Sequence, residues 1–247
     1  MSSKKCIVSF ASHARENYNK FLLGLIRSCH NAGWRREGGE YYIRSFDGYI
    51  DEYLGVPIIN GSYPITDRYG LCYNHDEVPW GFKPHLILEA AEKGYEQIIW
   101  CDSKVRMVQY PEPLLQLAKE RGVLAFDNLG HPLKYWLSDL AQQRLFISDK
   151  ELEDMKQIMG CMIIFDLTNP IGKKVLDRWL EASRDGVSFQ NYGSRREGFK
   201  ASRNDQACLS GIMNILGITI EPYGGLCYPP FDTTKEFGEP YFVNSGV

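Results

Sequence analysis

Two acidic motifs, far apart in the chain, carry the clearest chemical signal. Asp102 and Ser103 directly follow the apolar run 98–101, so a strand there would place both side chains at the carboxyl edge of a sheet. Ligands bind at that edge in open α/β sheets. Asp102 could hold a ribose hydroxyl or a divalent cation that bridges diphosphate oxygens. The structural alternative is an aspartate that only caps the turn after the strand.

The second motif is the segment 202–206, with Asp205 in the first turn of a predicted helix. The helix dipole favours a carboxylate at that position, so a structural role alone would account for it. A carboxylate held at a helix start could also act as a general base or stabilise a developing positive charge.

Basic side chains precede the second acidic motif. Arg196, Lys200 and Arg203 could neutralise a departing diphosphate, although such a run is often a solvated loop.

The end of the first predicted strand is a candidate nucleotide-binding turn. Ser9, Phe10 and Ala11 end this strand, where backbone amides and a hydroxyl commonly meet a nucleotide. Neither G-x-G-x-x-G nor G-x-x-x-x-G-K-[ST] occurs, which excludes the usual dinucleotide and P-loop sites.

The aromatic residues divide into core candidates and candidate stacking platforms. Most of the five tryptophans lie in apolar periodic segments and are predicted to be buried. Trp80 and Tyr73 lie in an irregular segment instead, so they are the better candidates for stacking on a ring.

The elements that must position these residues alternate between short apolar runs and amphipathic segments. This alternation predicts one α/β domain over residues 1–247, with a Rossmann-like mixed central sheet flanked by helices. The predicted strands are 5–11, 41–46, 96–101, 122–126, 159–165 and 218–221. The predicted helices are 13–30, 82–94, 113–121, 136–157, 170–184 and 204–216, the last capped by Asn204. Segment 48–81 is predicted to be a long loop, and the C-terminal tail to be irregular.

Composition narrows the class of protein. The 247 residues are 44% hydrophobic and 24% charged with a net charge of −3, and no basic run favours nucleic acid as a partner. The seven cysteines are widely spaced and form no C-x-x-C pair, which excludes a zinc knuckle and fits a reducing compartment. No apolar run approaches the roughly 18 residues of a membrane helix, and no signal peptide is evident. We therefore expect a soluble cytoplasmic protein.

Four local matches, in order, resemble glycosyltransferases of the GT-A fold. They are an opening strand and helix (6–30), Lys83-Pro84 before the strand that ends at Asp102, the strand 159–165, and Asn204-Asp205-Gln206 with Leu209 one turn on. The resemblance implies a nucleotide-sugar donor, with UDP expected, and a hydroxyl acceptor on a glycan. The base would lie near the first strand and the diphosphate near Asp102.

The resemblance also implies a set of site residues. Asp205 would lie near the anomeric carbon as the catalytic residue, and its role as a base would make the enzyme inverting; a retaining enzyme would use a carboxylate to stabilise an oxocarbenium-like species. The expected donor-binding residues are Ser9, Phe10, Ala11, Lys83, Asp102, Ser103, Arg196, Lys200 and Arg203. The expected acceptor-binding residues are Gly160, Gln206 and Trp80.

The metal motif of that family departs from its pattern in this chain. Lys104 stands where the second aspartate of D-x-D belongs, and the last histidine is His131, so a histidine ligand near the C-terminus is missing. Both changes argue against a tightly held Mn²⁺ or Mg²⁺. Lys104 could point away, could supply the positive charge itself, or could leave Asp102 as the sole protein ligand of a weak, donor-assisted metal.

Two other functions fit parts of the sequence. A glycosyltransferase-like module that binds sugar or nucleotide without transfer would explain the changed metal motif, but it has no need of Asp205 as a base. A nucleotidyltransferase would want an early glycine-rich loop, and residues 9–15 contain no glycine.

Overall fold

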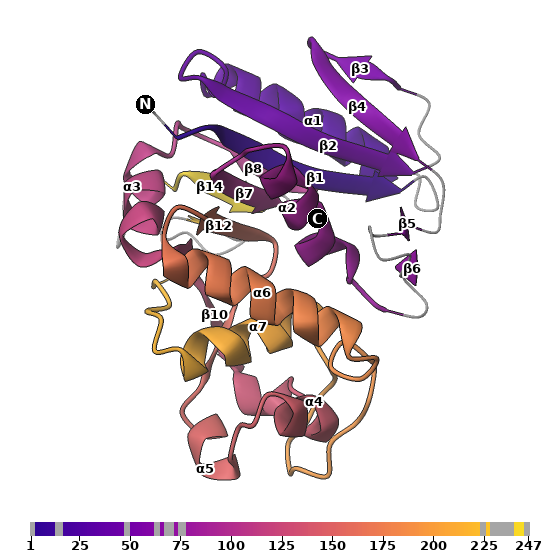
Figure 1. The fold of residues 1–247 in the computed structure, drawn as a ribbon, viewed down its shortest axis with the longest axis vertical. Helices are drawn as coiled ribbons and strands as arrows, with labels where there is room; N and C mark the ends of the chain where they lie inside the picture. Colours follow the sequence, from indigo (N-terminus) through magenta and orange to yellow (C-terminus); the bar gives the residue numbers. More distant parts are fainter. Residues whose placement is uncertain are drawn as a thin grey trace.

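A seven-stranded mixed sheet forms the centre of the protein, with strand order β3-β4-β2-β1-β7-β12-β9 (Figure 1). The computed structural model describes residues 3–12, 17–46, 50–61, 65–66, 72–73, 78–222, 226–227 and 240–244. The strands of the sheet are β1 (Lys5–Ser12), β2 (Gly39–Phe46), β3 (Glu52–Tyr53), β4 (Val56–Gly61), β7 (Gln97–Cys101), β9 (Val123–Leu124) and β12 (Met162–Asp166). β1 runs parallel to β2 and β7, whereas β12 runs antiparallel to β7.

Helices cover both faces of this sheet because its central strands are apolar on both sides. Residues such as Ile7 and Ile99 pack with α1 (Asn17–Asn31) and α3 (Glu112–Arg121). Their neighbours in sequence, such as Val8 and Trp100, pack in the opposite core with α2 (Phe82–Glu92), α6 (Pro170–Arg184) and α7 (Asn204–Ile215). Side chains that alternate between two cores are the pattern of a buried strand. The predicted mixed sheet flanked by helices is confirmed.

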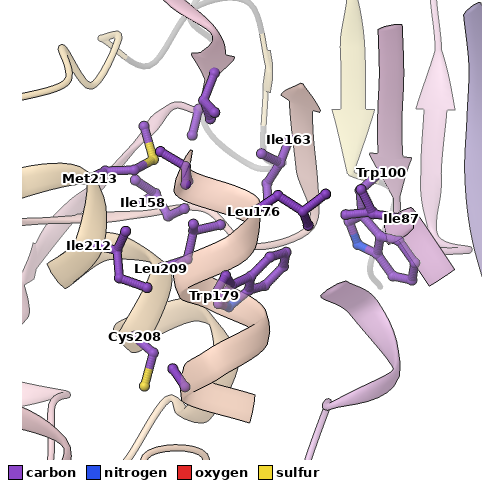
Figure 2. Close-up of a cluster of buried hydrophobic side chains, with 14 of the residues drawn as sticks. Ile87, Trp100, Ile158, Ile163, Leu176, Trp179, Cys208, Leu209, Ile212 and Met213 are labelled. Carbon is purple, nitrogen blue, oxygen red and sulfur yellow. The ribbon is translucent and has the colours of Figure 1, made fainter. Parts of the chain in front are cut away.

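Trp179 connects the core on the α6 and α7 side to the start of α7. Trp179 of α6 is fully buried beside Leu209 and Ile212 of α7 (Figure 2). Its indole N–H donates to the backbone carbonyl of Asp205 at 3.0 Å. One buried aromatic residue therefore joins the packing of the two helices to the position of the acidic motif.

Short elements complete the described chain. Figure 1 shows α4 (Asp139–Arg144) and α5 (Asp149–Leu152) at the end of the molecule remote from the sheet. Two smaller sheets pair β10 (Asp127–Pro132) with β11 (Lys156–Ile158) and β5 (Ile65–Thr66) with β6 (Cys72–Tyr73). In a third, β14 (Phe242–Asn244) lies between β13 (Leu226–Cys227) and β8 (Val105–Met107). A 3₁₀ turn, η1, spans Leu133–Tyr135. In the part of the chain described, no helix has both the length and the apolar character needed to cross a bilayer.

Four element predictions were wrong, each where a local pattern was weak. Within segment 48–81, β4 is a strand of the main sheet, held by the buried side chains of Val56 and Ile58. Segment 136–157 holds two short helices and β11 rather than one helix. Segment 218–221 forms only an isolated bridge between Glu221 and Phe126, and the tail contributes β14. These pairings are long-range, so short sequence windows do not encode them.

Candidate active site

The end of β7 and the start of β12 form one wall of the site. Because β12 is antiparallel to β7, Met162 pairs with Cys101, and the backbone N–H of Asp102 donates to the carbonyl of Cys161 at 2.7 Å. Asp102 and Gly160 therefore meet at the same sheet edge. The indole N–H of Trp100 donates to Oδ1 of Asp102 at 2.9 Å, which orients the carboxylate.

Lys83, in the first turn of α2, joins the two acidic motifs. Its Nζ lies 3.3 Å from Oδ1 of Asp102 and 3.1 Å from Oδ2 of Asp205, and it donates to the carbonyl of Gly160 at 3.0 Å. The Lys83 and Asp205 side chains are each 5% exposed, whereas that of Asp102 is 36% exposed. Asp205 is thus the deep carboxylate of the pair and Asp102 the accessible one.

Burial and charge set the protonation of this cluster. Burial raises the pKa of Asp205 to about 6, against the opposing effect of the Lys83 ammonium. Burial alone would lower the pKa of Lys83, but the carboxylates of Asp102 and Asp205 outweigh it and raise that pKa. At neutral pH the cluster therefore holds a permanent ammonium and a carboxylate that protonates only slightly below neutrality.

The first residues of α7 take their conformation from side-chain contacts outside the helix. Asn204 has φ +40°, and its Nδ2 donates to the carbonyl of Phe189 at 2.6 Å and to Oδ1 of Asn191 at 3.0 Å. The prediction that Asn204 caps the helix was wrong, since its side chain bonds to the preceding segment instead. Gln206 donates to the carbonyl of Ile158 at 2.7 Å.

These groups open onto a cavity of about 940 Å³. Of the predicted site residues, those that line it are Trp80, Lys83, Asp102, Gly160, Arg203, Asp205 and Gln206. The charges of the side chains that line the cavity sum to zero, because Lys83 and Arg203 are positive and Asp102 and Asp205 are negative. The two acidic motifs therefore share one cleft, as the sequence predicted.

Six predicted donor-binding residues do not line this cavity, namely Ser9, Phe10, Ala11, Ser103, Arg196 and Lys200. The hydroxyl of Ser9 is buried and donates to the carbonyl of Cys101 at 2.6 Å, so β1 uses it to bond β7. Phe10 packs on Phe82 with ring centroids 4.5 Å apart, and Ala11 is fully buried. Ser103 is 2% exposed and is not among the residues that line the cavity. The residues after β1 at 13–16, including His13, lie outside the described residues, as does the side chain of Tyr73.

The basic stretch separates into structural and accessible members. Arg196 donates to the carbonyls of Lys134 and Leu137 at 2.7 and 3.3 Å and bonds to Gln142, so its guanidinium holds the chain around α4. Lys200 is exposed, with Nζ 5.4 Å from the ring centroid of Trp136, and does not line the cavity. Arg203 stacks 4.5 Å from the same ring and does line it. Arg203 is therefore the member of the stretch that a ligand in the cavity can meet.

The residues around Asp102 do not fit a divalent metal. Nζ of Lys104 lies 5.2 Å from the ring centroid of Phe21 and 5.9 Å from that of Tyr18, toward α1. No group of three or more His, Cys, Asp or Glu side chains is placed to hold a metal ion within the described ranges. Oδ1 of Asp102 already faces Lys83 and Trp100.

Sequence reasoning missed several other residues that line the cavity. They come from β10, from the segment before β12 and from the end of β14, namely Asn128, Leu129, Gly130, His131, Met159, Cys161 and Asn244. Asn244 is 6% exposed, and its Oδ1 has no hydrogen-bond partner among the residues that the structure describes. A buried amide oxygen of this kind calls for a ligand hydroxyl or a water. Nothing in the local sequence of a short C-terminal strand marks it.

Comparisons with known proteins identify the fold. No protein-family model and no curated protein matches the chain. The structure is similar to that of the WbbM bifunctional glycosyltransferase, at a TM-score of 0.56 and 12% identity, with all of this chain and 46% of that chain covered. It is also similar to the glycosyltransferase GlyE of Streptococcus pneumoniae TIGR4, at a TM-score of 0.50 and 10% identity, with 100% and 55% covered.

The chain therefore has a GT-A-type glycosyltransferase fold, as the resemblance in sequence implied. It spans about half the length of these two structures. At such low identity the similarity concerns the fold, and function has to be argued from the site.

Proposed function

We propose that the protein transfers a sugar from a nucleotide-sugar donor, with UDP as the nucleotide, to a hydroxyl group of a glycan acceptor. The observation that carries the proposal is the convergence of Asp102, Lys83 and Asp205 on one cavity at the sheet edge. That edge is where open α/β sheets bind ligands. The fold is shared with two glycosyltransferases, which supports sugar transfer over other chemistry at such an edge.

Asp205 is the proposed catalytic residue. In the reaction the bond from the anomeric carbon to the diphosphate oxygen breaks, and its electron pair leaves with the diphosphate. The acceptor oxygen forms the new bond, and its proton passes to Asp205. This route inverts the anomeric configuration. Retention would instead assign Asp205 to stabilising positive charge on the sugar ring.

Arg203 is the proposed contact for the donor phosphates. Two cationic side chains, Lys83 and Arg203, line the cavity. Lys83 lies between the two carboxylates, so Arg203 is the cation that can contact a phosphate. A guanidinium can donate two parallel hydrogen bonds to a phosphate and stabilise the charge that develops as it leaves. Ser9, Phe10 and Ala11 lie on the strand that would approach the base through backbone atoms.

Acceptor binding is proposed at the wall formed by Gly160, Gln206 and Trp80. Asn244 adds a buried amide oxygen to the same cavity, which a sugar hydroxyl could satisfy. Burial raises the pKa of the neighbouring Cys161 thiol to about 12, so this cysteine is not a thiolate nucleophile at neutral pH.

The proposal is tested by incubating the protein with a panel of UDP-sugars and measuring the UDP released by chromatography. We expect release from at least one donor, and its loss in Asp205→Ala. The anomeric configuration of the product, read by NMR, then distinguishes inversion from retention. Donor binding without turnover, unchanged by Asp205→Ala, would instead support a binding module that carries out no transfer.

A further inference from the structure

We infer that this site works without a divalent cation, because the ammonium group of Lys83 occupies the space between its two carboxylates. The inference rests on the proposed function for its consequence, which is sugar transfer without metal. Its test is metal binding itself, which does not depend on the donor or the acceptor.

The oxygens around Lys83 are those that a hard metal ion would use. Nζ lies 3.3 Å from Oδ1 of Asp102, 3.1 Å from Oδ2 of Asp205 and 3.0 Å from the carbonyl oxygen of Gly160. These oxygens come from the end of β7, the start of α7 and the turn before β12. Carboxylate and carbonyl oxygens are the preferred ligands of Mg²⁺ and Mn²⁺. In this chain they surround an ammonium group instead.

The ammonium group is held in place on its other sides. The Lys83 side chain is 5% exposed, and Nζ lies 5.3 Å from the ring centroid of Trp80 and 5.6 Å from that of Trp100. Aromatic faces at this distance attract a cation. The indole N–H of Trp100 also donates to the Asp102 oxygen that faces Lys83. Neither the cation nor its ligand oxygen can turn away without losing these contacts.

The charged side chains of the cavity balance one another without a metal. Its charged side chains are two carboxylates and two cations, Asp102 and Asp205 against Lys83 and Arg203. A divalent cation beside Asp102 would meet the fixed ammonium at close range and be repelled. Lys104, which stands where the second aspartate of D-x-D belongs, adds a further positive charge that lies toward α1.

Lys83 and Arg203 have different roles because their surroundings differ. Lys83 neutralises the carboxylates, and Arg203 remains the cation that can meet a phosphate. A metal ion in a D-x-D site performs both tasks at once. Here two protein cations share them.

The first test is a titration of the wild-type protein with Mn²⁺, in which electron paramagnetic resonance measures the free ion. We expect no saturable site tighter than about 1 mM, the weak end for oxygen-ligated cations. A single site tighter than about 0.1 mM that disappears in Asp102→Asn would overturn the inference.

Two substitutions of Lys83 test whether its charge is what excludes the metal. Lys83→Ala leaves the oxygens facing an uncharged space, so we expect Mn²⁺ affinity to rise at least about tenfold and Mn²⁺ to raise the melting temperature. Lys83→Arg keeps the positive charge, so its Mn²⁺ affinity should stay as low as that of the wild type. Equal Mn²⁺ affinity in the two variants would contradict the assignment. Should Lys83→Ala not fold, the wild-type titration decides alone.

A third measurement covers a metal that enters only with the donor. Binding of UDP to the wild type is measured by calorimetry in EDTA and in Mn²⁺, and we expect dissociation constants that agree within about twofold. UDP binding that requires Mn²⁺ would overturn the inference. A chain that turns over no UDP-sugar would contradict the proposed function, but the Mn²⁺ titration would still decide this point.

Discussion

Lys83 of α2 and Asp205 of α7 form a buried ion pair, with Nζ 3.1 Å from Oδ2 and each side chain 5% exposed. The pair joins two helices that are distant in sequence, and the carbonyl of Gly160 completes the contact at 3.0 Å. A charged pair this deep is costly to desolvate, so its stability depends on both partners being present. The predictions below follow from that dependence and from the cavity onto which the pair opens.

Asp205→Asn removes the proposed base without changing the size of the side chain. We expect the rate of sugar transfer to fall by about 10²- to 10⁴-fold, the usual contribution of a general base. Steady-state kinetics with the donor identified in the UDP-sugar panel measures it. Asp177→Asn, on the exposed side of α6, is the matched control and should leave the rate unchanged. Equal rates in both variants would remove Asp205 from the chemistry.

The pH dependence follows from the burial of Asp205. The pKa of Asp205 is raised to about 6, so its carboxylate becomes protonated and can no longer accept a proton as the pH falls through about 6. We expect kcat/KM to rise with pH on a limb centred near pH 6 and to level off above it. The pKa of Asp205 is higher in the folded protein than in the unfolded chain, so the protonated carboxyl group stabilises the fold at low pH. That stabilisation is lost as the pH rises from the ordinary pKa of an aspartate to about 6. A rate that is flat between pH 5 and 7 would contradict the assignment.

Lys83→Met keeps much of the side-chain volume but leaves the Asp205 carboxylate buried without its cation. We expect the free energy of unfolding to fall by about 3 kcal/mol at pH 8, as for other broken buried pairs. Without the ammonium the pKa of Asp205 rises further, so the deficit should shrink as the pH falls toward 5. Urea unfolding at the two pH values measures this. A deficit that is the same at both would show that lost packing, not charge, is responsible.

Gly160→Ala tests the contact between the sheet edge and α7. A Cβ added at Gly160 would lie 3.0 Å from Cβ and 3.1 Å from Cγ of Gln206, so Gln206 has to shift by a few tenths of an ångström. We expect a loss of about tenfold in kcat/KM, because small displacements beside reacting groups are costly. Gly193→Ala, where an added Cβ meets nothing within 4 Å, is the control. Kinetics identical to those of the control would show that this wall does not position substrate.

Arg203 and Arg196 should fail in opposite ways when replaced by alanine. Arg203 lines the cavity, so Arg203→Ala should weaken binding of UDP about 10- to 100-fold and change stability little. Arg196 bonds to the carbonyls of Lys134 and Leu137, so Arg196→Ala should lower the unfolding free energy by about 1–3 kcal/mol and leave UDP binding intact. Calorimetry and urea unfolding on both variants separate the two effects. Weaker UDP binding in Arg196→Ala alone would reverse the assignment.

The central elements of the fold could be predicted because local pattern and final packing agree in them. β7 and β12 are short apolar runs, α6 is strongly amphipathic, and α2 and α7 are helices buried along most of their length. Each lies within a few residues of its predicted position. Asp102 could be placed at the sheet edge because it directly follows a strand, and Asp205 reaches the same cleft from the start of α7. β14 was missed because its partner β8 lies far along the chain, and β4 because its short apolar run lies in a segment rich in glycine and proline.

The candidate site was predictable in its acids and less so in its neighbours. Lys83 was predicted only as a donor contact, since nothing in the sequence shows that one lysine reaches both Asp102 and Asp205. Ser9 and Arg196 were expected to meet a ligand, yet each satisfies backbone carbonyls. Polar side chains at strand ends and in basic loops serve both purposes, and sequence alone does not separate them.

The measurement that tests the account most directly is a crystal structure of the protein with a bound UDP-sugar. The account predicts the sugar in the cavity with its anomeric carbon facing Asp205, the phosphates against Arg203, and Lys83 still between Asp102 and Asp205. A nucleotide sugar bound on another surface, with Asp205 shielded from it by other side chains, would contradict the account.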